Sequence, residues 1–466
     1  MKAILILFLT ALVVLFTGLT GRRDMLKGIT LAGLLLALGV TLMDLLGGDA
    51  GNQDTLYANM FVFDSYALAF SAVVLLTLTL IVGLSGWSFR QLNETLGDHY
   101  GLMLFSACGA LVMVSFTNLT MLFLGIEILS IPLYVLAGSR RRSMDSNEAA
   151  LKYFLMGAFA TGILLYGFTL VYGATGSFDV ATIAEKVRIA TERKNMLHIG
   201  ILMIIVGLSF KISAVPFHFW APDVYTGSPT LVTAFMATVV KTAGFAAFYR
   251  LFAGAFGDAA GFWGIALSAI AALTMTLANT TAIFQQDFKR MMAYSSIAHA
   301  GYLLMGVLSI GSASGGGDQA ILYYTLVYSV ATVVAFAVYM VVSEQNQDNT
   351  FLAFRGLGHK QPALAALMVL SMLTLAGIPP TAGFFGKYML FVSAFEQYTW
   401  LVVLAVINSA ISICYYFKVI VEMYFTQEEN AYSASMPKGY QWALWVGVLL
   451  MAVLAVWPGL VSILVG

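Results

Sequence analysis

The sequence predicts an all-α polytopic membrane protein with about fourteen transmembrane helices. Of its 466 residues, 60% are hydrophobic and only 10% are charged, whereas soluble domains carry about 25% charged residues. Apolar stretches of about 20 residues, the length that crosses a bilayer as a helix, recur along the whole chain. Two of these stretches are interrupted by proline and glycine, a pattern typical of transporters with broken helices.

The chain divides into fourteen candidate spans. The first one also looks like a signal peptide, and this alternative stays open, although no persuasive cleavage site follows it and further spans do. The fourth and fifth spans meet at Thr117 and Asn118, which predicts a tight hairpin between them. The predicted spans are 2–20, 26–47, 60–86, 100–117, 118–138, 148–174, 196–220, 229–251, 260–284, 291–310, 320–343, 362–397 (broken), 399–425 and 441–463.

The two broken spans are the features around which the chain is organised. In the first, Pro216 follows Lys211 by five residues, and in the second the pair Pro379 and Pro380 precedes Lys387. A proline inside a helix removes a backbone hydrogen bond, and a lysine at the centre of a membrane helix costs about 3 kcal/mol. Both features together predict a broken helix that lines a polar cavity.

The positions of these breaks suggest an internal repeat of two five-helix groups. Each broken span is the fourth of its group, and because five is an odd number, the second group must be inverted relative to the first. We therefore divide the chain into four parts. They are the three N-terminal helices (1–99), a first repeat (100–253), a second, inverted repeat (260–425) and a C-terminal helix (441–466).

The basic residues of the loops predict the orientation. With the N-terminus outside, the cytoplasmic loops hold twice as many Lys and Arg residues as the outer ends and loops, as the positive-inside rule requires. An even number of spans then places both termini on the outer side. The outer loop 175–195 contains the segment FDVATIAEKVRIA, which predicts a short amphipathic helix on the membrane surface.

Ionisable residues inside the spans form the candidate site. Each has a simpler alternative: a lysine near a span end extends to the interface, a mid-span charge forms a static ion pair, and a lone histidine packs in the core. The first alternative applies most to Lys152 and Lys418, which lie nearest to span ends. The candidates for proton translocation are Glu127, Lys152, Lys211, Lys241, His299 and Lys387.

The energetics argue against a purely structural role for all of these residues. Three mid-span lysines at about 3 kcal/mol each approach the net stability of an ordinary domain, about 5–15 kcal/mol. One central carboxylate, Glu127, offsets one lysine at most. Burial disfavours the charged form of a lysine without a carboxylate partner, so such a lysine exchanges its proton more readily. A row of such groups predicts a proton relay.

Other kinds of chemistry have no support in the sequence. Lys plus Arg and Asp plus Glu both number 23, so no basic surface for nucleic acid is expected. The two cysteines, Cys108 and Cys414, match no metal-site spacing, and no nucleotide-binding, haem or metalloprotease motif occurs. We therefore expect neither a cofactor nor a metal on this chain.

Three segments resemble a known family. The run KISAVPFHFWAPDVYTGSPT is similar to the signature of the antiporter-like membrane subunits of respiratory complex I and of multi-subunit sodium/proton antiporters. The segments SRRRSMDSNEAALKYFLMGAFATGILLYG and AGIPPTAGFFGKYMLF resemble the subunit N group of bacterial NADH–quinone oxidoreductases in particular. Lys387 supports this group, because the neighbouring antiporter-like subunit carries glutamate there. The resemblance covers most of the chain and is strongest from Gly125 to Lys387.

The resemblance implies a proton-translocating subunit in the membrane arm of this enzyme, in the bacterial plasma (inner) membrane. Glu127, Lys211, Lys241 and Lys387 match the family's proton-channel residues, Lys152 matches a further channel-associated lysine, and His299 matches a polar residue of the second half. The implied partners are the lipid bilayer and other membrane-arm subunits, including neighbouring antiporter-like and small ones. The implied NAD, FMN, iron–sulfur clusters and quinone belong to partner subunits.

The resemblance also implies a mechanism. Redox energy released elsewhere in the complex reaches this subunit as a conformational or electrostatic change. A charge shift near Glu127 then drives a proton from Lys211 through Lys241 to Lys387. Three alternatives stay open: a subunit of a multi-subunit cation/proton antiporter, a subunit of an energy-converting hydrogenase, and a structural subunit that transports nothing.

Overall fold

The computed structural model describes residues 1–21, 23–47, 59–85, 96–189, 193–312, 315–346, 348–426 and 438–461. The first half of the chain contains α1 Lys2–Leu19, α2 Arg23–Leu46, α3 Ser65–Gly83, α5 Leu96–Ser115, α6 Leu119–Ala137, α7 Met144–Thr175, α8 Val180–Ile189, α9 Lys194–Lys211, α10 Trp220–Gly227, α11 Thr230–Phe235, the π-helical segment η3 Met236–Val240 and α12 Lys241–Ala255. The second half contains η4 Gly257–Ala259, α13 Ala260–Ile283, α14 Phe288–Leu308, α15 Gly317–Asn346, η5 Phe351–Phe354, α16 Leu357–Lys360, α17 Pro362–Ala376, α18 Ala382–Phe395, α19 Thr399–Phe425 and α20 Lys438–Val456.

The predicted all-helical membrane fold is confirmed. Within the described residues, twelve helical segments are long and apolar enough to cross a membrane. Three shorter apolar helices, α17, α18 and α20, supply the broken twelfth span and the last one. Each of the fourteen predicted spans therefore contains helix, because long apolar runs form helices whose backbone groups are all paired internally.

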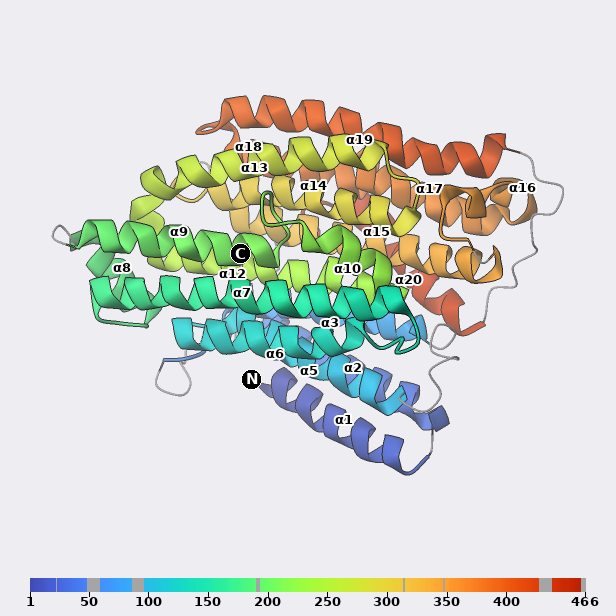
Figure 1. Ribbon diagram of the computed structural model, residues 1–466, viewed down its shortest axis with the longest axis horizontal. Helices are drawn as coiled ribbons and strands as arrows, with labels where there is room; N and C mark the ends of the chain where they lie inside the picture. Colours follow the sequence, from blue (N-terminus) through green and yellow to red (C-terminus); the bar gives the residue numbers. More distant parts are fainter. Residues whose placement is uncertain are drawn as a thin grey trace.

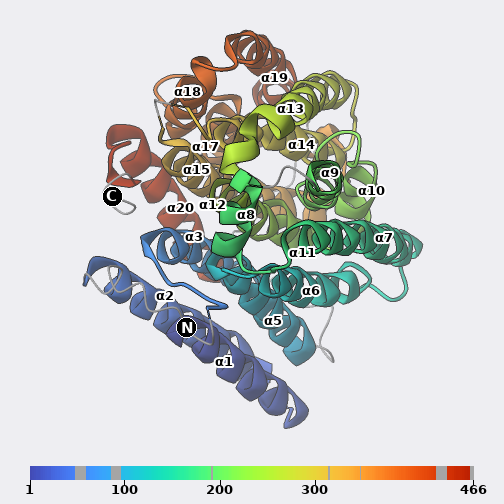
Figure 2. The same cartoon turned by 90° about the vertical axis from the view of Figure 1, so that its left-hand side faces the viewer.

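Most helices run side by side along the long axis of the molecule (Figure 1). Seen from one end, α1 and α2 lie at one edge and α13 and α19 at the opposite edge, with α12 and α15 between them (Figure 2). The spans of α12, α14 and α15 are almost wholly buried by their neighbours. A polar side chain on one of these three helices therefore faces other helices and not lipid.

Local sequence explains how several helices begin. Asn118 lies in the hairpin between α5 and α6, and its side chain accepts a hydrogen bond from the backbone N–H of Thr120, which caps α6. This confirms the predicted tight hairpin. The predicted amphipathic segment after α7 forms helix α8, whose Ile183 side chain is buried while both basic residues of its last turn are exposed.

Both broken spans are interrupted at their prolines. The first half-helix, α9, ends at Lys211, and the non-helical residues 212–219 contain Pro216. The second break, 377–381, contains Pro379 and Pro380. We predicted that the first of these spans ends at residue 220, whereas α10 begins there and continues to Gly227. That boundary was wrong because the broken helix resumes after the proline for two further turns.

Candidate functional site

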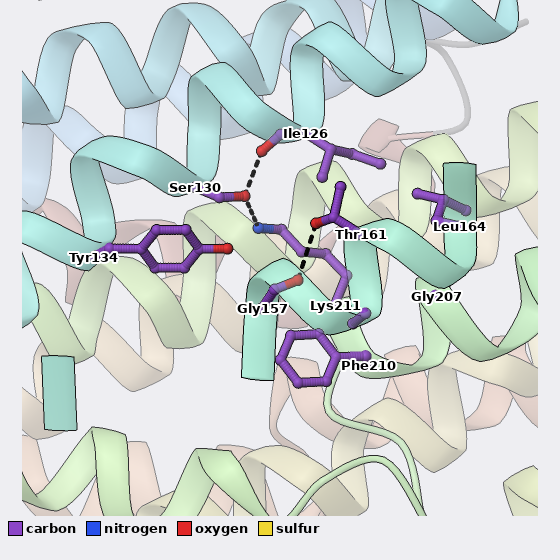
Figure 3. A pocket seen from close by; sticks show the side chains of 10 residues that line it. Ile126, Ser130, Tyr134, Gly157, Thr161, Leu164, Gly207, Phe210 and Lys211 are labelled. Atoms are coloured by element: carbon purple, nitrogen blue, oxygen red, sulfur yellow. Dashed lines mark hydrogen bonds between the residues drawn. The ribbon is translucent and has the colours of Figure 1, made fainter. Parts of the chain in front are cut away.

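Lys211 lies at the end of the first half-helix, next to the break. Its side chain is 7% exposed, and its Nζ atom donates a hydrogen bond of 2.5 Å to Oγ of Ser130 in α6. The hydroxyl of Ser130 in turn donates to the backbone carbonyl of Ile126, one turn earlier (Figure 3). The break thus brings a buried amine against a neutral hydroxyl on a neighbouring helix.

Glu127 lies on α6, three residues before Ser130. Its carboxylate acts electrostatically on Lys211, but the two do not form an ion pair. One carboxylate oxygen of Glu127, Oε1, is buried and has no hydrogen-bond partner within the described part of the chain. Glu127 and Lys211 are therefore neighbours that remain unpaired in this conformation.

Lys241 lies at the centre of the bundle. It is the first residue of α12, directly after the π-helical segment η3, and it is 2% exposed. Its Nζ atom donates to the backbone carbonyl of Ser296 in α14. Single-turn π segments inside α-helices frequently mark functional sites, and this one follows from no feature that we recognised in the sequence.

Lys387 occupies the second broken helix, in α18, and is 3% exposed. Its Nζ atom donates to the carbonyl of Ala376 at 2.7 Å and to Oγ of Ser409 in α19 at 2.9 Å. The same nitrogen lies 4.9 Å from the ring centroid of Tyr302. Gly377 ends α17 with φ of 77° and packs directly against the Lys387 side chain. A hydroxyl thus binds this lysine too.

His299 links the centre of the bundle to the second half. It lies in α14, is 2% exposed, and is hydrogen-bonded through Nδ1 to the hydroxyl of Tyr324 (2.6 Å) and through Nε2 to that of Tyr416 (2.9 Å). Both Lys387 and Lys241 lie close enough to act on it electrostatically. The imidazole thus connects two hydroxyl groups between two lysines.

Lys152 lies apart from this group, in an ion-pair cluster that includes Asp223. Its side chain is 39% exposed and contacts Oε1 of Glu148 and Oδ2 of Asp223, each at 2.6 Å. The other oxygen of Asp223 binds Arg290 of α14 at 2.9 Å. These residues line an open cavity of about 170 Å³. Among the described residues, Lys152 therefore shares no hydrogen bond or ion pair with the buried lysines.

The short helix α10 is attached at this cluster to two other helices. Asp223 lies on α10, so its ion pairs tie α10 to α7 and α14. Lys289, also of α14, donates to the backbone carbonyls of Thr226 and Ser228 at the end of α10. A cation at a helix C-terminus stabilises the unpaired carbonyls there. The second half of the first broken helix is thus fixed from outside its own span.

The three central lysines share one chemical property. None forms an ion pair with any carboxylate that the structure describes. Each donates to neutral oxygen atoms, and both an ammonium and a neutral amine can donate such bonds. A proton can therefore leave each lysine without the loss of its hydrogen bond.

Sequence reasoning missed the hydroxyl groups of this site. Hydropathy counts a mid-span Ser or Tyr as an ordinary part of a helix, so no local signal separates these residues from packing residues. The pairs that they form always join two different helices. Some of these helices are far apart in the chain, as for Ser130 with Lys211 and Tyr416 with His299, and others are consecutive, as for Ser409 with Lys387 and Tyr324 with His299. The missed residues are Ser130, Ser409, Tyr324 and Tyr416, together with the backbone carbonyl of Ser296.

In the described part of the chain, the side chains that could bind a metal ion do not cluster. Within the residues described, no group of three or more His, Cys, Asp or Glu side chains comes together to hold a metal ion. Cys108 and Cys414 are both free thiols. The buried polar side chains described above are lysine, histidine, hydroxyl and carboxylate groups, which can donate or accept protons.

The sequence is similar to those of known proteins. The family model described as "NADH:quinone oxidoreductase/Mrp antiporter, TM" matches residues 116–412. A protein of Cytophaga hutchinsonii named NADH-quinone oxidoreductase subunit N is 42% identical over 434 residues, which cover 92% of this chain and 91% of the relative. A protein of the same name from Trichlorobacter lovleyi is 46% identical over 385 residues, which cover 82% and 78%.

Solved structures support the same comparison. A chain of respiratory complex I from Thermus thermophilus with bound aureothin superposes with a TM-score of 0.82 at 36% identity, covering 98% of both chains. A chain of the archaeal membrane-bound sulfane sulfur reductase superposes with a TM-score of 0.87 at 23% identity, covering 99% of this chain and 95% of that one. At that identity, the second likeness shows the fold alone.

Proposed function

The chain belongs to the subunit N family of the proton-translocating NADH–quinone oxidoreductases, and we propose that its buried lysines carry the protons. The proposed path begins at Glu127 and Lys211 in the first broken helix and crosses the centre at Lys241. It continues past His299 to Lys387 in the second broken helix. Lys152, outside this path, is proposed to act at its cytoplasmic end.

The observation that carries this proposal is the absence of described carboxylate partners around Lys211, Lys241 and Lys387. A lysine that only stabilised the fold would be expected to gain from a paired carboxylate, because an unpaired buried charge is costly. Neutral oxygens instead allow both protonation states. A proton arriving at one lysine then changes the charge that its neighbours experience.

Within the described part of the chain, no hydrogen bond directly joins the buried lysines and His299 to one another. Among the described residues, Lys211 and Lys241 share no hydrogen bond, so transfer between them requires water or side-chain movement. Beyond Lys241 the connection is closer, because His299 is flanked by both Lys241 and Lys387. We therefore expect transfer from Lys211 to Lys241 to be the slower step within this subunit.

Substitution of Lys241 by methionine tests the proposal. Methionine keeps the length of the side chain and removes the proton-exchanging amine. In membrane vesicles that contain the complete complex, we expect Lys241→Met to abolish the proton pumping contributed by this subunit. Lys418→Met is the matched control, because Lys418 also lies in a span but near the end of α19, where its Nζ atom donates to Gln285 and Gln286 and lies over the ring of Phe351. Equal pumping in both variants would overturn the proposal.

We also propose which groups the chain works with. Its partners are other membrane-arm subunits, including neighbouring antiporter-like and small subunits, and NAD, FMN, iron–sulfur clusters and quinone are bound by partner subunits. Tagging the chain and extracting it gently tests this. Recovery of NADH–quinone reductase activity with the tagged material is the expected result. Repeated recovery of the chain without redox subunits would contradict it.

The orientation is a further part of the proposal. Both termini lie on the outer side of the bacterial plasma membrane, so the Arg141 loop faces the cytoplasm and Lys186 of α8 faces outward. In a background with Cys108 and Cys414 replaced by alanine, a membrane-impermeant maleimide applied to intact cells should label Lys186→Cys and spare Arg141→Cys. The reverse pattern would invert the topology.

The alternatives are less well supported. A cation/proton antiporter would use similar buried lysines, but the relatives at 42% and 46% identity are named as oxidoreductase subunits. Dependence of transport on sodium would favour the antiporter. If the subunit is purely structural, replacing Lys241 leaves the pumping of the assembled complex unchanged, so the same variant tests that alternative as well.

A further inference from the structure

Ser130 lies beside Lys211, on the same face of α6 as Glu127. It lies three residues after Glu127 on α6, and residues three apart are neighbours on one helix face. Ser130 is 1% exposed and binds Lys211 at 2.5 Å, while Glu127 lies close enough to act on the same lysine electrostatically. The lysine therefore has two acceptors within one turn of α6, a neutral one that it binds and a charged one that it does not.

We propose that Ser130 is a positioning residue that alternates with Glu127 as the partner of Lys211. This inference rests on the proposed proton path. In the conformation seen here, Ser130 holds the amine away from the carboxylate and leaves Oε1 of Glu127 without a described partner. In the alternative conformation, the ammonium of Lys211 pairs with Glu127. Ser130 thereby sets the balance between a lysine that keeps its proton and one that can release it.

The surrounding space allows this exchange. A cavity of about 10 Å³ lies beside Lys211, lined by Ser130, Tyr134 and Thr161 among others. Figure 3 shows the hydroxyl groups of these residues directed toward the lysine side chain. This volume is the minimum that one water molecule needs, and the hydroxyl groups of the wall supply polar partners for it. The amine can thus leave Ser130 while a water or hydroxyl group replaces its hydrogen bond.

A glycine on α7 keeps this space open. At Gly157, a β-carbon would collide with the hydroxyl end of Tyr134. The absence of a side chain there allows Tyr134 to reach the wall of the cavity. Thr161, one turn further along α7, donates its hydroxyl proton to the carbonyl of Gly157, which leaves its oxygen lone pairs available to accept a hydrogen bond.

The chemistry of the two acceptors differs in a way that can be measured. A carboxylate strongly stabilises the ammonium form, whereas the neutral Ser130 hydroxyl can accept from an ammonium or from an amine and favours the ammonium far less. Removing the hydroxyl leaves Glu127 as the remaining strong acceptor. Lys211 should then release its proton only at higher pH, and the curve of pumping against pH should move upward in pH.

The test uses the complete complex in sealed membrane vesicles. We expect Ser130→Ala to lower the number of protons pumped per NADH oxidised near neutral pH. This number should recover as the pH rises. Ser130→Thr, which restores the hydroxyl, should return the profile toward that of the parent. The matched control is Ser209→Ala, because Ser209 is fully buried two residues before Lys211 and its hydroxyl makes no hydrogen bond with described residues.

A second readout separates positioning from packing. In infrared difference spectra, the carboxylate band of Glu127 is identified by its loss in Glu127→Gln. This band should shift in Ser130→Ala, because the ion pair between Glu127 and Lys211 is then favoured. An unchanged pH profile and band in assembled Ser130→Ala complex would overturn the inference. So would a uniform loss of pumping that threonine does not rescue, since that indicates packing alone.

Lys211→Met, measured in parallel, separates a failure of the role of Ser130 from a failure of the proposed proton path. If Lys211→Met abolishes pumping while Ser130→Ala matches the parent at every pH, the role of Ser130 is wrong and the proton path stands. If Lys211→Met pumps normally, the proposed path itself fails, and the role of Ser130 fails with it.

Discussion

The Nζ atom of Lys152 in α7 lies 2.6 Å from Oδ2 of Asp223 in α10. This pair joins a continuous span to the second half of the first broken helix. Because Arg290 of α14 binds the other oxygen of Asp223, one carboxylate connects elements of both predicted repeats. The position of α10 therefore depends on charges from outside its own span.

Asp223→Asn should loosen this connection without unfolding the subunit. The groups are about one-third exposed, and such pairs contribute about 0.2–1 kcal/mol each in solvent-exposed settings. We expect normal amounts of subunit in the membrane, measured by immunoblot, and reduced proton pumping. Asp258→Asn, which removes the exposed pair with Arg188, is the control and should pump normally. Equal pumping by both variants would show that the ion pairs of Asp223 on α10 do not contribute to proton transport.

Lys289→Met should increase the mobility of the end of α10. Lys289 is 5% exposed and binds the carbonyls of Thr226 and Ser228, and hydrogen bonds to a charged donor contribute about 1.5–3 kcal/mol. Part of this free energy is regained, because methionine removes a buried charge. Hydrogen–deuterium exchange of the α10 backbone amides should accelerate more than in Lys152→Met. Identical exchange in the two variants would contradict the capping role.

Tyr416→Phe should impair pumping more than Tyr415→Phe. The hydroxyl of Tyr416 binds Nε2 of His299 and Oγ of Ser295, so its removal leaves buried polar groups without a partner at about 1–3 kcal/mol. The hydroxyl of Tyr415 donates to Oδ1 of Asn279 and interacts with the hydroxyl of Tyr416, but it makes no described hydrogen bond with His299. Proton pumping per electron in vesicles measures the difference. If Tyr415→Phe proved the more damaging change, the hydroxyl group next to His299 would not belong to the path.

Gly377→Ala should reduce pumping through Lys387. At φ of 77° an alanine costs about 1–2 kcal/mol, and its β-carbon would press on the Lys387 side chain. Gly176→Ala is the matched control, because Gly176 has φ of 74° and nothing near its β position. Thermal unfolding of the purified complex should shift similarly in both variants. Loss of pumping confined to Gly377→Ala is the expected result, and equal pumping would contradict it.

The sequence was sufficient to predict the helices and their interruptions. Apolar runs of span length predicted fourteen spans, and the structure places helix in each of them. Pro216 and the pair Pro379 and Pro380 lie in the two breaks as predicted. These features follow from the sequence because hydropathy and the loss of a backbone N–H at proline act within a few residues. The burial of Lys211, Lys241 and Lys387 followed from their depth in these runs.

Only the tertiary structure decided what each charged group contacts. Ser130 precedes Lys211 by 81 residues and Ser296 follows Lys241 by 55, and no local pattern relates such pairs. The structure also placed Lys152 with Asp223, 71 residues away, and not with the buried lysines. A side chain in a packed bundle binds whichever group the neighbouring helix presents, and helix packing is a property of the whole chain. The residue types that exchange protons were therefore readable from the sequence, and their partners were not.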